Sequence, residues 1–130
     1  MKTIDSLSEL DMPVKHRNFL QKYLDNLSKI DIIDRIILFG SCAKGYIHEH
    51  SDIDLMIIGN GITRDDETNI YGYSLPDVPY KEYVSTDVII CSQETYDEYK
   101  TQYGYVQRHV EKDGIELTNY LNSMKGVIVS

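Results

Sequence analysis

The stretch Ile36-Ile37-Leu38-Phe39-Gly40-Ser41, followed after ten residues by Asp52-Ile53-Asp54-Leu55-Met56-Ile57-Ile58, decides the fold of this chain. Both apolar runs have the length of single strands and are rich in isoleucine, which predicts two buried strands. A glycine at the end of the first run lets the backbone bend where a side chain would obstruct it. The segment between the runs is expected to form a turn and a short helix.

The predicted turn carries groups that can hold phosphate. The hydroxyl of Ser41 and the free backbone N–H groups at the start of the following helix can donate to phosphate oxygens. Lys44 can add a positive point charge, although not the bidentate contact of a guanidinium. Gly40, Ser41 and Lys44 are therefore candidate phosphate-binding residues.

The second strand brings two acids that can serve as metal ligands. Alternate strand residues point to the same face, so we expect Asp52 and Asp54 to project together while Ile53 enters the core. Their Cα atoms would lie roughly 6.6 Å apart, two strand rises. Such a pair can converge on two ions about 3.5–4 Å apart, as in two-metal phosphoryl-transfer sites. Mg²⁺ suits hard carboxylate ligands completed by water and substrate phosphates.

A third acid follows in the strand-like run Val84-Ser85-Thr86-Asp87-Val88-Ile89-Ile90. If this run pairs beside the strand of Asp52 and Asp54, Asp87 faces the same ions. Acids at strand ends are commonly turn formers or solvated groups, and an Asp-x-Asp pair alone is weak evidence of a site. The whole pattern, however, is expected by chance in roughly one chain in a thousand of this length.

At these residues the sequence resembles the minimal nucleotidyltransferases of the DNA polymerase β superfamily, which share Gly-Ser, a similar gap, Asp-x-Asp and a later Asp. The similar pattern runs from about residue 32 to residue 90, and a weaker similarity continues over residues 109–117. The resemblance implies an α/β (α+β) fold, with a small mixed twisted sheet and helices packed on one side. A chain of 130 residues has the usual size of one domain, so we expect a single nucleotidyltransferase domain over residues 1–130.

The resemblance further implies a site and an activity. Asp52, Asp54 and Asp87 would be catalytic and would hold two Mg²⁺ ions, with Asp87 also serving as general base. Gly40, Ser41, Lys44 and Ser51 would bind the nucleotide. Members of this group often act as antitoxins that transfer AMP from ATP to a tyrosine of a HEPN ribonuclease toxin. The family commonly has arginines just after Gly-Ser, where this chain has Cys42 and Lys44.

Two alternatives to the antitoxin enzyme stay open. The chain could modify a small molecule such as an aminoglycoside, in which case a homo-oligomer could supply the missing wall of the substrate site. It could also be a catalytically weak antitoxin that acts by binding alone, although a pure binder has no need of the three acids.

The composition of the chain indicates which classes of binding partner are compatible with it. The chain has 130 residues and a formal net charge of −8. An acidic chain without a basic stripe disfavours nucleic acid and favours a basic protein or a cationic small molecule, although plain solubility explains the charge equally well. No apolar run reaches the roughly 20 residues of a membrane span, and no signal peptide begins the sequence, so we expect a cytoplasmic protein.

The remaining segments give weaker signals. Leu20, Tyr23, Leu24 and Leu27 recur at helical spacing and predict a helix packed on the sheet. Ser92 predicts the start of a helix through about residue 103, and residues 107–112 predict another helical turn that ends with Gly114 as its left-handed cap. The tyrosines of the loop over residues 71–83 are expected either to pack with their hydroxyls in water, to stack on a nucleobase or to form a partner interface. Cys42 is expected either as a space-filling residue or as a thiol activated by the helix start.

Overall fold

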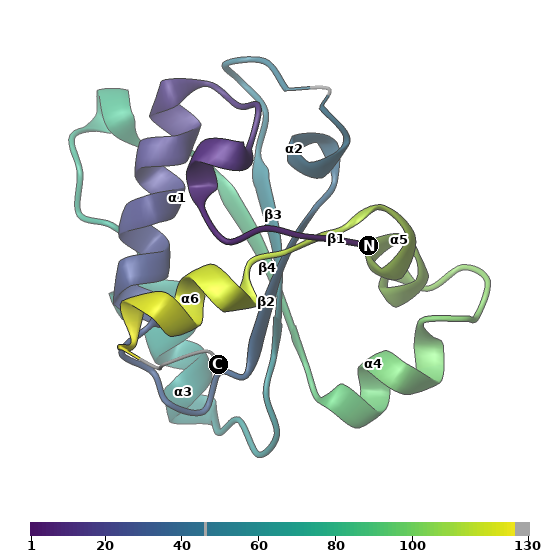
Figure 1. The fold of residues 1–130 in the computed structure, drawn as a ribbon. Helices are drawn as coiled ribbons and strands as arrows, with labels where there is room; N and C mark the ends of the chain where they lie inside the picture. The colour runs from purple at the N-terminus through teal and green to yellow at the C-terminus, as the bar shows by residue number, and fades with distance from the viewer. Residues whose placement is uncertain (46, 127–130) are drawn as a thin grey trace.

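The computed structural model describes residues 1–45 and 47–126, which form a mixed sheet in the strand order β1-β5-β2-β3-β4 (Figure 1). The strands are β1 (Lys2–Thr3), β2 (Arg35–Phe39), β3 (Ile53–Ile58), β4 (Thr86–Cys91) and β5 (Ile115–Glu116). The central pair β2–β3 is antiparallel, whereas β3 and β4 run parallel. At the other edge, β5 is antiparallel to β2 and parallel to β1.

The helices differ widely in length. The α-helices are α1 (Val14–Leu27), α2 (Ser41–Lys44), α3 (Arg64–Thr68), α4 (Gln93–Tyr99), α5 (Val106–Asp113) and α6 (Thr118–Met124). Three further single turns are the 3₁₀ helices η1 (Leu7–Glu9) and η3 (Tyr80–Glu82) and the π-helix η2 (Asn69–Tyr73). None of the helices in the described part of the chain is long and apolar enough to cross a membrane.

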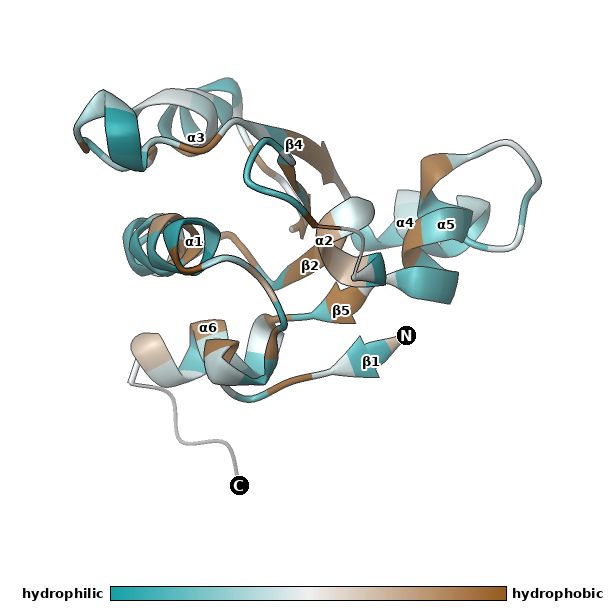
Figure 2. Ribbon diagram, turned by 90° about the horizontal axis from the view of Figure 1, so that it is seen from above, coloured by the Kyte–Doolittle hydropathy of each residue, from teal (hydrophilic) through white to brown (hydrophobic). Residues whose placement is uncertain are grey.

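The strands separate two apolar clusters because their side chains alternate between the faces of the sheet. On the face covered by α1 and α6, Leu38 and Leu55 belong to the larger cluster together with Leu24 of α1. On the face covered by α4 and α5, a smaller cluster holds five buried residues: Ile37, Met56, Ile58, Tyr96 and Val110. Figure 2 shows the brown strands between the α1–α6 side and the α4–α5 side.

The α+β class and the small mixed sheet expected from the sequence are confirmed. The long helix α1 packs on one face, as its apolar stripe predicts: Phe19, Leu20, Tyr23, Leu24 and Leu27 are all buried. The layer of α4 and α5 on the second face is an addition to the one-sided arrangement expected from the sequence. These two helices cover Ile37, Met56 and Ile58 on the second face of the sheet.

The ends of α4 and α5 correct two expectations. Ser92 does cap α4, where its hydroxyl accepts from the backbone N–H of Thr95 at 3.1 Å, but the helix ends at Tyr99. Gly114 follows α5 with a φ of −70°, so it is not a left-handed cap. Its role is close packing, since a Cβ atom there would lie 2.4 Å from the carbonyl oxygen of Val110 and 2.8 Å from Ile37.

Candidate functional site

The turn after β2 depends on Gly40. Its φ of 71° and ψ of −152° fall in a region that is essentially restricted to glycine. A Cβ atom at this position would lie 2.1 Å from Oδ2 of Asp54, so the missing side chain also makes room for the carboxylate. The glycine therefore brings the backbone that leads into α2 directly against the acid of β3.

Asp54 and Asp87 are paired residues on neighbouring parallel strands, as the sequence predicted. By alternation, Asp54 shares a face with Met56 and Ile58, and Asp87 shares a face with Ile89 and Cys91. This is the face of α4 and α5, but both acids lie at the strand ends beyond that cover. Asp54 is half-buried and Asp87 is exposed to solvent. The pair therefore sits at an open edge of the smaller cluster.

Asp52 directly precedes β3 and is exposed. The predicted alternation is kept, because Ile53 is fully buried in the larger cluster and lies between the two acids. Ser51, in contrast, is buried, and its hydroxyl accepts a hydrogen bond from the backbone N–H of His48 at 3.0 Å. The serine thus closes the turn from which Asp52 projects.

The three acids interact electrostatically through Asp54. Burial and, after it, the nearby charges of Asp87 and Asp52 together raise the pKa of Asp54 from its ordinary value of 3.8 to about 6. Like charges that share a site disfavour ionisation unless a cation neutralises them. The chemistry of this set therefore favours a bound cation.

The pKa of Asp54 makes a prediction for stability without metal. Its folded pKa near 6 exceeds the unfolded value near 3.8, so the folded state holds the proton more tightly. The carboxyl consequently stabilises the fold below about pH 4, and this contribution is lost as the pH rises through 6. After allowance for solvent screening of a half-buried group, the loss is about 1 kcal/mol.

Thermal unfolding in EDTA between pH 4 and 7 measures this effect as the difference in stability between the wild type and the Asp54→Asn variant. The wild type should lose stability relative to the variant over this range, and added Mg²⁺ should restore it at pH 7. If the stability of the two proteins changed in parallel with pH, the pKa of Asp54 would not be raised in the folded state. Asp97→Asn serves as a control, because the hydrogen bond with Lys100 lowers the pKa of that exposed carboxyl, so the difference in stability between this variant and wild type should stay constant between pH 4 and 7.

The acids do not form a closed cage. Within residues 1–45 and 47–126, no group of three or more His, Cys, Asp or Glu side chains is arranged to hold a metal ion. Mg²⁺ does not require such a group, since it is commonly bound by one or two carboxylates together with waters and substrate phosphates. A pair of acids at an open strand end, in which the charge of Asp87 helps to raise the pKa of Asp54, fits that mode of binding.

The other candidate residues surround the turn. Ser41 begins α2 and is half-buried. Lys44 ends the helix, and its Nζ lies 3.8 Å from Oδ2 of Asp113 on α5, so its charge is partly engaged. Burial, followed by the charges of Asp54 and Asp52, raises the pKa of the Cys42 thiol to about 11. Cys42 is therefore a neutral space-filling residue and not an activated thiol.

The tyrosine-rich loop lies on the opposite side of the sheet from Asp54 and Asp87. Tyr83 packs edge-on against Phe19 of α1 with ring centroids 5.2 Å apart, and Ile70 and Val84 enter the larger cluster. Tyr73 and Tyr80 are 83% and 92% exposed. Because the loop packs on the side of α1, its aromatic rings are not placed to stack on a nucleotide at the acids.

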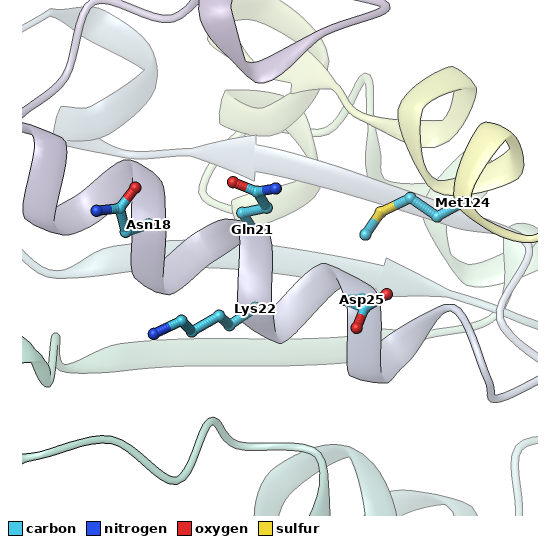
Figure 3. Close-up of a pocket in the computed structure, with 5 residues that line it drawn as sticks. All are labelled: Asn18, Gln21, Lys22, Asp25 and Met124. Carbon is cyan, nitrogen blue, oxygen red and sulfur yellow. The ribbon is translucent and has the colours of Figure 1, made fainter.

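Two cavities differ in their relation to the site. One of about 420 Å³ lies along the outer face of α1, where Asn18, Gln21, Lys22 and Asp25 line it with Met124 of α6 (Figure 3). None of the predicted site residues reaches it. A second cavity of about 350 Å³ adjoins α2, with Cys42, Ala43 and Gly45 in its wall. Only the second could extend the space beside the Gly40 turn.

One buried polar contact at the site has no counterpart among the sequence-based expectations. His16 of α1 is fully buried, and its Nε2 lies 2.7 Å from the carbonyl oxygen of Ser51. The sequence did contain a signal for the burial of His16, because this residue lies four positions before Leu20 on the apolar stripe of the helix. A polar residue on a buried stripe indicates a specific partner, but the sequence does not identify that partner.

Comparison with known proteins gives the family. The sequence model described as "Polymerase beta, Nucleotidyltransferase" matches residues 18–120. Among solved structures, the fold resembles that of a Sulfolobus solfataricus protein assigned provisionally as a nucleotidyltransferase, with a TM-score of 0.51 and 17% sequence identity over 79% of this chain and 82% of that one. No curated protein sequence matches. Because the family model spans most of the chain and includes Gly40, Asp54 and Asp87, the protein belongs to the polymerase beta nucleotidyltransferase family.

Proposed function

We propose that this protein is a Mg²⁺-dependent nucleotidyltransferase that transfers AMP from ATP to a tyrosine hydroxyl of a partner HEPN ribonuclease, and thereby acts as an antitoxin. The observation that carries the enzymatic part is the pairing of Asp54 with Asp87 on adjacent strands beside the Gly40 turn. The antitoxin role rests on the resemblance of the motif to minimal nucleotidyltransferases. A net charge of −8 is compatible with a basic partner protein.

In this mechanism the nucleotide binds with its phosphates near Gly40, Ser41, Lys44 and Ser51. Asp52, Asp54 and Asp87 hold Mg²⁺, which when bound neutralises phosphate charge and lowers the pKa of an acceptor hydroxyl. Asp87 accepts the proton of that hydroxyl, consistent with its exposure on the open side of the site. The acceptor oxygen then bonds to the α-phosphorus as the bond to the bridging oxygen breaks, and pyrophosphate leaves. Positioning and charge neutralisation are the main contributions of the protein.

The first test is calorimetric titration of ATP into the purified protein with Mg²⁺ and with EDTA. We expect binding that requires Mg²⁺ and that disappears in the Asp52→Asn/Asp54→Asn double variant, because the carboxylates that hold the ion are gone. Circular dichroism should show that the double variant remains folded. Binding that persists in EDTA, or unchanged binding by the folded double variant, would contradict the proposed site.

The acceptor needs a second experiment. ATP labelled at the α-phosphate is incubated with the protein and with a HEPN-type protein encoded by a neighbouring gene, if one is present. Label on a tyrosine of that protein, with loss of its ribonuclease activity, supports the antitoxin enzyme. Inhibition of the ribonuclease without labelling would instead indicate an antitoxin that acts by contact alone.

Modification of a cationic small molecule remains the second candidate, because the acidic chain would attract such a substrate. A single chain of this size leaves little wall for a small-molecule site, so this candidate predicts a homo-oligomer. Sedimentation analysis distinguishes the two: a monomer favours the protein acceptor, whereas a stable dimer that releases pyrophosphate with an aminoglycoside favours the small molecule.

A further inference from the structure

His16 makes a buried hydrogen bond to the backbone that leads into the acidic strand. The imidazole is fully buried on the sheet-facing side of α1, and its Nε2 lies 2.7 Å from the carbonyl oxygen of Ser51. A carbonyl oxygen can only accept, so Nε2 must carry the hydrogen and donate it. The contact joins α1 to a segment 35 residues further along the chain. The next residue is Asp52.

The turn before β3 is held by several further hydrogen bonds. The backbone N–H of Ser51 donates to the carbonyl of His48 at 3.0 Å, and the hydroxyl of Ser51 accepts from the N–H of His48 at 3.0 Å. The following carbonyl, that of Asp52, accepts from the thiol of Cys42 at 3.2 Å. Two consecutive carbonyls therefore accept from side chains of two different helices, α1 and α2.

This support matters because Asp52 lies outside the strand ladder. Asp54 is fixed by its neighbours Phe39 and Asp87 on the two adjacent strands, whereas Asp52 directly precedes β3 and is exposed. Its orientation depends on the backbone at Ser51 and on the contacts of that backbone. Loss of the imidazole would also leave the carbonyl of Ser51 without its donor in a buried place, which is costly.

The alternative is that His16 merely fills space. Its other ring nitrogen, Nδ1, is buried and has no hydrogen-bond partner among the described residues. Burial of an unpaired polar nitrogen is unfavourable, and an apolar side chain would fill the same place without that penalty. The observation that justifies a histidine at this position is therefore the hydrogen bond from Nε2 to Ser51.

We infer that His16 is a positioning residue for the acidic site, acting through the carbonyl of Ser51 to fix the turn from which Asp52 projects. This inference rests on the proposed function, because it assigns to that site a support from α1. Functional side chains need to be held to within about 0.5 Å by their surroundings, and a buried hydrogen bond from a long helix supplies such a restraint.

The test compares two variants of His16. His16→Met removes the donor and keeps an apolar side chain of similar length, whereas His16→Gln places an amide N–H near the position of Nε2. The matched control is Tyr23→Phe, which removes another buried hydrogen bond from α1 to a backbone carbonyl, that of Ile70 at 2.6 Å, on a segment remote from the acids.

Two quantities are measured for each variant. Hydrogen exchange of the His48 and Ser51 amides, followed by NMR without nucleotide, reports the turn itself. Calorimetry reports Mg²⁺-dependent ATP binding. We expect His16→Met to speed the exchange and to weaken the binding by about tenfold each, the effect of one buried hydrogen bond. His16→Gln should restore both to within about threefold of wild type, and Tyr23→Phe should leave both unchanged.

The outcomes separate the inference from the proposed function. Wild-type exchange rates in His16→Met would overturn the positioning role, and so would a His16→Gln variant no better than His16→Met, which would indicate packing alone. If the wild type fails to bind Mg²⁺-ATP, the proposed function fails, whereas the exchange rates still decide whether His16 holds the turn. Should His16→Met not fold, His16→Asn replaces it, because the shorter amide falls short of Ser51.

Discussion

Replacement of Asp54 with asparagine is expected to reduce nucleotidyl transfer roughly 10²–10³-fold or more while the fold persists. Asp54 lies between its strand neighbours Phe39 and Asp87 and is the acid whose pKa the other two carboxyls raise. Asparagine keeps the shape but loses the charge that would hold a cation. Asp52→Asn and Asp87→Asn should act in the same direction, since each removes one carboxylate of the set.

Pyrophosphate release with ATP and the acceptor measures the loss. Asp34→Asn is the matched control, because Asp34 is an exposed acid beside the opposite end of β2 and its replacement should not change the rate. Thermal unfolding at neutral pH should show that Asp54→Asn is at least as stable as wild type, since a strained charge has been removed. A folded Asp54→Asn protein with full activity would rule out the three-carboxylate mechanism.

Gly40→Ala is expected to destabilise the protein and to disrupt the candidate site at the same time. The added Cβ would meet Oδ2 of Asp54 at 2.1 Å, and the backbone at Gly40 has angles that side chains do not tolerate. We expect a loss of about 2–4 kcal/mol in the free energy of unfolding, together with loss of nucleotide binding. Urea denaturation and ATP calorimetry measure the two effects.

The Gly45→Ala variant distinguishes the effect of the Cβ clash at Gly40 from the effect of backbone strain alone. Gly45 also has a positive φ, 81°, but no atom would lie within 4 Å of an added Cβ. Its replacement should cost only about 1 kcal/mol and leave nucleotide binding unchanged. Equal losses of stability in the two variants, with binding intact in both, would show that the approach of Gly40 to Asp54 is unimportant.

The centre of the sheet could be predicted from sequence because each of its strands has a local signal. β2, β3 and β4 are short apolar runs with β-branched residues, and the acid within the third run indicated its pairing beside the second. The family motif then connected Gly40 with Asp54. These inferences required only the alternation of strand residues and the bend at a glycine.

The remaining features depend on contacts between distant residues. β1 and β5 are two residues each and exist because they pair with each other and, through β5, with β2, so neither has a periodic signal of its own. The second face of the sheet is covered through a few contacts, such as Tyr96 and Val110 against Met56. The bond from His16 to Ser51 likewise joins residues that sequence spacing does not relate.

The pairing of β1 with β5 also constrains the order in which the chain can fold. Lys2 pairs with Ile115 and Thr3 with Glu116, so this edge of the sheet joins residues from nearly opposite ends of the described chain. Contacts of such wide sequence separation form late and slow the folding of a domain. During synthesis, the β2–β3 hairpin and its acids can assemble long before β5 has left the ribosome. The Gly40 turn and the strand of Asp54 should therefore form first, and closure of the sheet should be the last step of folding.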